Sequence, residues 1–402
     1  MKYIYILQQA LIWILLIYWI YQLIISFCAL IKIREKPLLT NKKHKFMAII
    51  PAHNEENVVG NLVKSLNELD YPKELYDVYV IADNCTDKTV EIAKKEGAIV
   101  YERFDEKRKT KGYALNWFLD KKIKENADYD AFCVFDADNL VDKNFLNAMN
   151  KKLCQGETVV QGYKDIKNPT DSWISSGYAL FYWTQHKFYQ LARYNAGLSP
   201  LMNGTGFMVK FDLIKDTGWN TKTLTEDIEF SLINISSGNK LGWAVDAIVY
   251  DEQPTTFGQS WTQRIRWTVG HIQCLKLYTK DLAKGVIKNK TLTSFDGLLY
   301  IMCIPLFIIS LLLIIVNFVL YLMSQMTFGL MMLNILAYML LGYILLVITA
   351  LVTLIVEKRS IKKMIKGIIT YPIFMASWSV INFVSLFKRN IKWDKIEHGK
   401  NV

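Results

Sequence analysis

Four long apolar runs constrain this chain more than any other feature of its sequence. They cover Tyr3–Ile31, Leu298–Met323, Phe328–Val356 and Ile368–Phe387. A helix that crosses a bilayer needs about 20 apolar residues, and a signal peptide has a shorter apolar core than the first run. The runs therefore predict an N-terminal transmembrane anchor over residues 1–32 and a C-terminal transmembrane region over residues 297–388.

Basic residues gather beside these runs. One group follows the first run and another precedes the second: Lys32, Arg34, Lys36, Lys42, Lys43 and Lys45, and then Lys276, Lys280, Lys284, Lys288 and Lys290. Flanking charge of this kind is typical of the cytoplasmic side of a membrane and attracts anionic lipid. We therefore assign the net charge of +11 to contact with the membrane lipid bilayer and expect no nucleic acid partner. The pattern predicts a multi-pass protein of the cell (plasma) membrane, with its middle region in the cytoplasm.

The last apolar run is weaker than the other three, because it contains Pro372, Trp378 and Asn382. If it crosses the membrane, the basic stretch 388–395 falls outside the cell, against the usual charge bias. A re-entrant or interfacial helix is the competing interpretation. The sequence favours neither of the two.

The region between the anchor and the later runs, residues 46–293, alternates between two patterns. Apolar stretches of strand length occur at Phe46–Ile50, Val78–Ala82, Ala98–Tyr101 and Ala131–Phe135, separated by helical patterns at 57–69, 87–96 and 114–124. This alternation predicts an α/β domain built on a parallel sheet. The same region includes a predicted interfacial helix over residues 259–287, just before the membrane. Ligands of open α/β sheets bind at the carboxyl ends of strands, which is where Asp83 and Asp136 fall.

Two of the polar motifs follow strands directly. Asp136 and Asp138 are spaced so that they can share a divalent cation, and Mg²⁺ or Mn²⁺ prefers such oxygen ligands and bridges phosphates. The alternative is an ordinary solvated turn, which Asp favours. Asp83 could contact the base of a nucleotide, while Thr86 or Asp87 in the same motif could cap the next helix.

The remaining motifs each allow a structural and a functional interpretation. Lys111, ahead of a glycine and a helix start, could approach a diphosphate. Glu226 and Asp227 could be an acidic first helical turn, or could supply a carboxylate that removes a proton from a hydroxyl. The segment from Gln263 to Trp267 could be an amphipathic interfacial helix, or could use Arg266 on a departing diphosphate and Trp267 on an acceptor sugar. A glycine-flanked loop at Gly204 and Thr205 could be a tight turn or a backbone approach to a sugar.

Taken together, the motifs resemble the membrane-bound inverting glycosyltransferases of family 2, the group that contains the cellulose, hyaluronan and poly-N-acetylglucosamine synthases. The resemblance runs from about residue 46 to residue 267 and rests on these segments: Pro51-Ala-His-Asn-Glu-Glu56, Ile81-Ala-Asp-Asn-Cys-Thr-Asp87, Lys111-Gly-Tyr-Ala-Leu-Asn116, Asp136-Ala-Asp138, Thr225-Glu-Asp227 and Gln263-Arg-Ile-Arg-Trp267. Many members carry Asp-Asp-Gly where this chain has Ala82-Asp83-Asn84, so only Asp83 is carried over as the uridine contact.

The resemblance implies a GT-A (Rossmann-like) fold and a role for each matching residue. The catalytic group comprises Asp227 as general base, Glu226 and Arg266. The nucleotide-sugar group comprises Asp83, Glu55, Lys111, Asp136 and Gln263. The acceptor group comprises Trp267, Gly204 and Thr205. The metal ligands are Asp138 and Asp136, which would bind Mg²⁺ or Mn²⁺.

By the same resemblance, the chain is expected to be a processive β-glycosyltransferase. It would use a UDP-sugar, with UDP-glucose favoured and UDP-N-acetylglucosamine next, to make a cell-surface or extracellular polysaccharide. The alternative is the transfer of one sugar to a membrane lipid, so the acceptor is a glycan or a lipid. A sensor that binds nucleotide sugars without catalysis is disfavoured by the intact Asp136, Asp138 and Asp227. An oligomer is compatible with the sequence.

Overall fold

A computed structural model describes residues 2–31, 35–324 and 327–388. Within these ranges, eight strands form one mixed sheet in the order β3-β2-β1-β4-β7-β6-β8-β5. Their bounds are β1 Phe46–Ala52, β2 Tyr76–Asp83, β3 Ile99–Arg103, β4 Ala131–Val134, β5 Leu140–Val141, β6 Val159–Ile166, β7 Phe207–Lys210 and β8 Gly242–Asp251. The architecture is that of a GT-A glycosyltransferase, as predicted from the sequence.

The first half of the sheet agrees with the predicted parallel arrangement. Strands β3, β2, β1 and β4 are parallel neighbours. The strands β2, β1 and β4 are almost wholly buried, whereas β3 lies at the edge of the sheet and is partly exposed. The second half is not parallel throughout, because β7 pairs antiparallel with both β4 and β6. The sequence prediction missed this because β7 is only four residues long and pairs with strands far from it in sequence.

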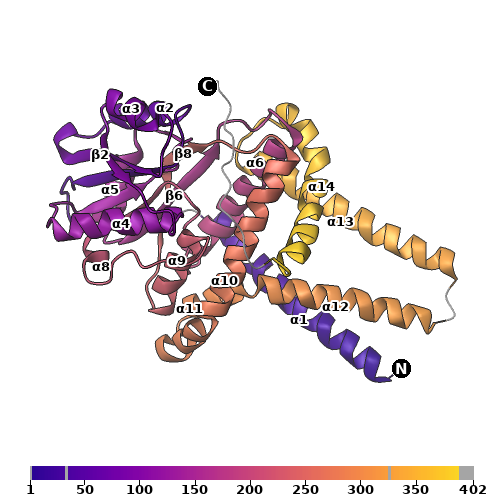
Figure 1. The fold of residues 1–402 in the computed structure, drawn as a ribbon. Coiled ribbons are helices and arrows are strands. Elements are labelled where there is room, and N and C mark those ends of the chain that lie inside the picture. Colours follow the sequence, from indigo (N-terminus) through magenta and orange to yellow (C-terminus); the bar gives the residue numbers. More distant parts are fainter. Residues whose placement is uncertain (1, 32–34, 325–326, 389–402) are drawn as a thin grey trace.

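Helices cover both faces of the sheet (Figure 1). On one face, α2 (Val59–Asn67), α3 (Thr89–Lys95) and α5 (Phe145–Cys154) pack into a core with the inward side chains of the strands. On the other face, α4 (Lys111–Lys124) and α9 (Glu226–Ser236) do the same, together with the long helix α10 (Phe257–Asn289). The short helices α7 (Ala192–Asn195) and α8 (Asp212–Lys215) lie in the connections. The sheet is thereby fixed between two layers, and its carboxyl-end edge is left for a site.

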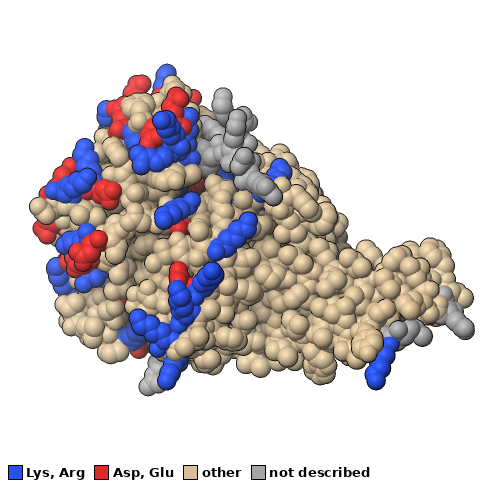
Figure 2. All heavy atoms as spheres, turned by 60° about the horizontal axis from the view of Figure 1, so that its bottom comes forward, with Lys and Arg blue, Asp and Glu red and all other residues tan. Residues whose placement is uncertain are grey.

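Of the described helices, four are long and apolar enough to cross a membrane: α1 with its short extension (Lys2–Leu30), α12 (Cys303–Leu322), α13 (Phe328–Val356) and α14 (Ile361–Ser385). The helices α1, α12 and α13 project from the α/β domain, whereas α14 lies against it beside α6 (Trp173–Gln185) and α10 (Figure 1). Charged side chains crowd over the α/β domain in Figure 2 and are nearly absent from the projecting helices on that face. The predicted end of the anchor at residue 32 and the basic stretch from residue 389 lie outside the described residues.

Buried polar contacts fix the projecting helices to the domain. Arg193 forms an ion pair of 2.8 Å with Asp296 of α11 (Leu292–Ile301), and it also donates to Gln22 of α1. Just after the end of α13 in the sequence, the guanidinium of Arg359 contacts Asp165 Oδ2 of β6 at 2.7 Å. The carboxyl ends of α1 and α13 are therefore held at the domain, while the amino end of α1 lies at the remote end of the bundle (Figure 1).

Candidate active site

A cavity of about 1340 Å³ runs from the sheet to the membrane-type helices. At one end it is lined by residues that follow β1 and β2, including Glu55 and Asp83. At the other end it reaches Ile304 in the first turn of α12, and Trp378 and Asn382 in the last turns of α14. The cavity thus connects the carboxyl edge of the sheet with helices that are apolar enough for a bilayer.

Asp83, the last residue of β2, lies at the sheet end of the cavity. Arg103, the last residue of the neighbouring strand β3, contacts its Oδ1 at 2.5 Å, and the side chain of Asn84 donates to the same oxygen. Burial raises the pKa of the Asp83 carboxyl, and the guanidinium of Arg103 opposes that shift. Arg103 is only 5% exposed and holds Asp83 in place.

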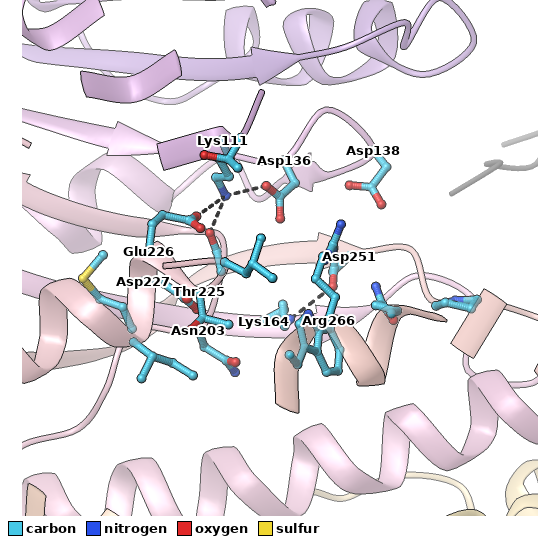
Figure 3. Close-up of a pocket in the computed structure, with 18 of the residues that line it drawn as sticks. Lys111, Asp136, Asp138, Lys164, Asn203, Thr225, Glu226, Asp227, Asp251 and Arg266 are labelled. Carbon is cyan, nitrogen blue, oxygen red and sulfur yellow. Dashed lines mark hydrogen bonds and ion pairs between the residues drawn. The ribbon is translucent and has the colours of Figure 1, made fainter. Parts of the chain in front are cut away.

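Lys111 is the first residue of α4 and points at the centre of the site (Figure 3). Its Nζ contacts Asp136 Oδ1 at 2.5 Å, the carbonyl oxygen of Gly204 at 2.6 Å and Glu226 Oε1 at 3.7 Å. Burial alone would lower the pKa of Lys111, but the carboxylates of Asp136 and Glu226 raise it above its usual value. The lysine is therefore held as a cation between two carboxylates that come from different elements.

The glycine-flanked loop has two different roles in the structure. Gly204 lies at the cavity wall with a φ of +80°, and a Cβ placed on it would be about 4 Å from both Asp136 and Asp227. Thr205, by contrast, is fully buried and is not among the residues that line the cavity. Its hydroxyl accepts from the backbone N–H of Asp136 at 3.0 Å. Thr205 therefore fixes the loop of Asp136 instead of facing an acceptor.

Asp138 lies deep in the site, close to other acidic side chains. Burial raises the pKa of Asp138 well above its usual value, and the negative charges of Asp251, Asp136, Glu55 and Glu252 add to that shift. Bound Mg²⁺ commonly takes one or two protein carboxylates and completes its shell with water and substrate phosphates. Within the described residues, no three His, Cys, Asp or Glu side chains converge as a complete cation site. The pair Asp136 and Asp138 therefore fits a cation that is bound together with a diphosphate.

Glu226 and Asp227 form the first turn of α9, on the other side of Lys111 (Figure 3). Burial raises the pKa of Glu226 to about 7; Lys111 opposes that shift, and the negative charge of Asp227 adds to it. Burial also raises the pKa of Asp227, while the backbone N–H groups of Ile228 and Gly204 favour its ionised form. A carboxylate whose pKa lies above its usual value is a better proton acceptor, as a general base requires.

Two glycines let neighbouring helices approach this turn. A Cβ on Gly112 of α4 would lie 2.8 Å from the hydroxyl of Thr221, and a Cβ on Gly270 of α10 would lie 2.6 Å from a side-chain atom of Thr225. Both distances are too short for a real Cβ contact. The acidic turn therefore packs closely against both α4 and α10 because Gly112 and Gly270 have no side chains.

The segment from Gln263 to Trp267 lies on α10, over the opposite side of the cavity. Gln263, Arg266 and Trp267 line the cavity, and burial lowers the pKa of Arg266 against the opposing charges of Glu226 and Asp136. Arg264 points away and is fully buried. It donates to the backbone oxygen of Phe374 and, at 2.7 Å, to Ser377 Oγ, and so ties α10 to α14.

Several cavity residues lie outside the motifs found in the sequence. Lys164 of β6 is 5% exposed, contacts Asp251 Oδ2 at 3.3 Å and lies 3.8 Å from the ring centre of Tyr182. Burial would lower the pKa of Lys164, but Tyr182 and Asp251 raise it above its usual value. In the sequence, Lys164 could have been recognised as a site residue because it stands with Asp165 as a charged pair inside a β-rich run. Trp378 and Asn382 could have been recognised because they are polar or aromatic residues in the weakest apolar run.

Comparison with known proteins gives one family match and several curated relatives. A family model described as "Glycosyltransferase like family 2" matches residues 44–270. The probable glycosyltransferase YdaM of Bacillus subtilis is 25% identical over 88% of this chain and 86% of its own length. The poly-β-1,6-N-acetyl-D-glucosamine synthase of Staphylococcus epidermidis is 26% identical over 73% of both chains. The β-monoglucosyldiacylglycerol synthase of a Nostoc species is 30% identical over 63% of this chain, which spans about half of that relative's length (54%).

Among solved structures, the mannosyltransferase PcManGT of Pyrobaculum calidifontis, in complex with GDP-mannose and Mn²⁺, is similar with a TM-score of 0.63. The similarity covers 94% of this chain and 99% of that one, at 16% sequence identity. At that identity, the comparison establishes the fold and leaves the substrate open.

Proposed function

Because this chain belongs to glycosyltransferase family 2, we propose that it transfers a hexose from a UDP-sugar to the end of a growing β-linked polysaccharide at the membrane. UDP-glucose is the favoured donor and UDP-N-acetylglucosamine the next. The observation that supports this proposal is the cavity itself, which joins a carboxylate-rich donor end to an acceptor end at the membrane-type helices. Its similarity to a poly-N-acetylglucosamine synthase over 73% of the chain agrees with a glycan product.

The proposed reaction is a single in-line displacement. Asp227 accepts the proton of an acceptor hydroxyl, the hydroxyl oxygen forms a bond to the anomeric carbon, and the bond from that carbon to UDP breaks. UDP leaves with the bonding electrons, and the sugar is inverted from α to β. Arg266 and Lys111, which both line the cavity, would supply positive charge to the departing diphosphate.

Asp83 and Glu55 would hold the nucleoside end of the donor, and Gln263 its sugar–diphosphate end. A divalent cation held by Asp136 and Asp138 would neutralise diphosphate charge when bound. Lys111 contacts Asp136 in the structure, so donor binding would redistribute this contact between the lysine, the carboxylate and the phosphates. Glu226, next to the base, would keep Lys111 oriented through its 3.7 Å contact.

We also propose a membrane orientation with three crossings. Helices α1, α12 and α13 would cross, with the α/β domain in the cytoplasm, and α14 would lie in the inner interface against α6 and α10 (Figure 1). The exposed face of α14 is apolar, with Ile365, Ile369 and Phe383 about half exposed, and Lys362 and Lys363 are near its start. This arrangement leaves the basic C-terminal segment in the cytoplasm, in accord with the charge bias.

A second candidate is the transfer of one sugar to a membrane lipid such as a diacylglycerol. One observation favours it: the described parts of α1, α12 and α13 are apolar and mostly exposed, as in a small membrane anchor. The relative named β-monoglucosyldiacylglycerol synthase agrees with this candidate. A polymer would then need a partner or a second copy of this chain to cross the bilayer.

The two candidates differ in their product. Purified protein is incubated with each radiolabelled UDP-sugar and Mg²⁺ or Mn²⁺ in lipid nanodiscs, and the product is sized and digested with linkage-specific glycosidases. A labelled polymer with β-linkages is the expected result, and a single labelled lipid would replace the first candidate by the second. An Asp227→Asn preparation is the control for a contaminating synthase.

A further inference from the structure

Resting on the proposed function, we infer that helix α14 forms the second wall of a site for a saccharide acceptor, with Trp378 as its contact surface. The indoles of Trp378 and Trp267 lie nearly parallel, at an interplanar angle of 22°, with ring centres 6.4 Å apart. Phe181 of α6 adds a third ring, 5.9 Å from Trp378. All three line the cavity, so the motif residue Trp267 is only one part of a larger aromatic surface.

Contacts from α10 hold this surface in place. Arg264 donates to Ser377 Oγ at 2.7 Å, and its guanidinium lies 5.2 Å from the ring centre of Trp378. One turn further along α10, the hydroxyl of Thr268 shares its proton between the Arg264 carbonyl oxygen at 3.0 Å and Asn382 Oδ1 at 3.3 Å. Trp378 is therefore bracketed by two fixed contacts. A side chain on a helix that only touched lipid would not need such positioning.

The polar groups around the aromatic surface favour a saccharide over an acyl chain. Amide side chains are also among the residues that line the cavity: Gln185, Asn203, Gln253, Gln263 and Asn382. Some pair with protein groups, since Asn203 Nδ2 donates to Gln185 Oε1 at 3.1 Å and Gln253 Nε2 donates to Asp251 Oδ2 at 2.5 Å. Amides both donate and accept hydrogen bonds, as sugar hydroxyls do, so this lining suits a saccharide better than an acyl chain. Among the described residues, neither Trp378 Nε1 nor Gln263 Oε1 has a hydrogen-bond partner, although both atoms are shielded from solvent. Because both atoms are shielded, a hydroxyl-rich ligand would pair with them only when the two side chains turn toward the cavity.

The inference predicts direct binding of a saccharide, which can be measured without turnover. Cellotetraose, tetra-N-acetylchitotetraose and dioctanoylglycerol are titrated into the full chain in nanodiscs with UDP and Mn²⁺ present, by calorimetry. We expect one of the two tetrasaccharides to bind. Trp378→Ala should weaken that binding by about two- to tenfold, the range expected for loss of one aromatic contact, and Trp378→Phe should retain most of it.

Matched variants separate a sugar contact from a loss of structure. Phe383→Ala removes an exposed aromatic side chain from the same helix, and Trp173→Ala removes an indole from α6 that does not line the cavity. Neither should change saccharide affinity, and UDP affinity should be the same in all variants. Unchanged saccharide affinity in Trp378→Ala, or an equal loss in Phe383→Ala, would overturn the inference, as would binding of dioctanoylglycerol alone. If the wild type binds a tetrasaccharide but never extends it, the proposed polysaccharide synthesis is wrong while the acceptor wall stands.

Discussion

The donor end and the acceptor end of the cavity are lined by different kinds of residue. The donor end holds Asp83, Asp136, Asp138 and Lys111, which lie on or next to the ends of strands and at the start of α4. The acceptor end holds Trp267 and Trp378, which lie on the helices α10 and α14, and amide side chains also line the cavity. Charges fixed by a sheet suit a diphosphate that is the same in every turnover, whereas aromatic and amide groups on helices suit an acceptor that must be released or moved. Substitutions at the two ends should therefore fail in different ways.

The largest effect is expected at Asp227, where the two ends meet. Asp227→Asn keeps the shape of the side chain but cannot accept a proton, so transfer should fall about 10²- to 10⁴-fold, the usual contribution of a positioned base. UDP binding should survive, because Asp227 is not part of the nucleotide group. Radiolabelled transfer and UDP calorimetry measure the two quantities. Asp246→Asn, at an exposed position on β8, is the control, and near-normal turnover in Asp227→Asn would exclude this residue as the base.

The next effect concerns the cation at the donor end. Asp138→Ala removes an oxygen ligand and one charge of a buried acidic group, so metal-stimulated UDP affinity should fall by about 10- to 100-fold or more. UDP titrations with and without Mn²⁺ measure directly how much the metal raises UDP affinity. Asp128→Ala, at an exposed position after α4, should leave it unchanged. Equal stimulation in Asp138→Ala and in the wild type would remove Asp138 from the metal site.

At the acceptor end, Trp267→Ala should change the partition between transfer and hydrolysis. Water needs no aromatic surface, so elongation should drop about tenfold more than UDP-sugar hydrolysis does. The ratio is measured on equal amounts of purified protein, with Trp173→Ala as the control for an interfacial indole. An unchanged ratio would leave Trp267 as a membrane anchor and would weaken the processive hypothesis.

The donor end could be predicted from the sequence and most of the acceptor end could not. Each of the residues Asp83, Asp136 and Lys111 lies at or near the end of a strand or the start of a helix. Their proximity therefore follows from the arrangement of the sheet, because ligands bind at the carboxyl ends of its strands. Thr205 sits in the predicted loop, but its burial depends on how that loop meets Asn139 and Asp136. Trp378 reaches the cavity because α14 packs against α6 and α10, and the contacts of Arg264 and Thr268 with α14 join residues more than 100 positions apart in the sequence.

The smallest predicted effect is a shift in the pH profile of transfer. Asp227 acts as a base only when ionised, and burial raises its pKa, while the adjacent Glu226 has a pKa of about 7. The rate should therefore rise with pH as the Asp227 carboxyl ionises, with a midpoint above the usual pKa of an aspartate, because burial raises the pKa of this group. Glu226→Gln removes a like charge next to Asp227, which makes ionisation of the base easier, so the midpoint of the rise should move to lower pH.

Initial rates at saturating donor across a pH series measure the midpoint, and UDP affinity at each pH controls for donor binding. Because the acceptor wall carries no titratable carboxylate, Trp378→Phe should leave the midpoint where it is in the wild type. A midpoint that moves upward in Glu226→Gln, or moves equally in Trp378→Phe, would contradict the assignment of the proton transfer to the first turn of α9.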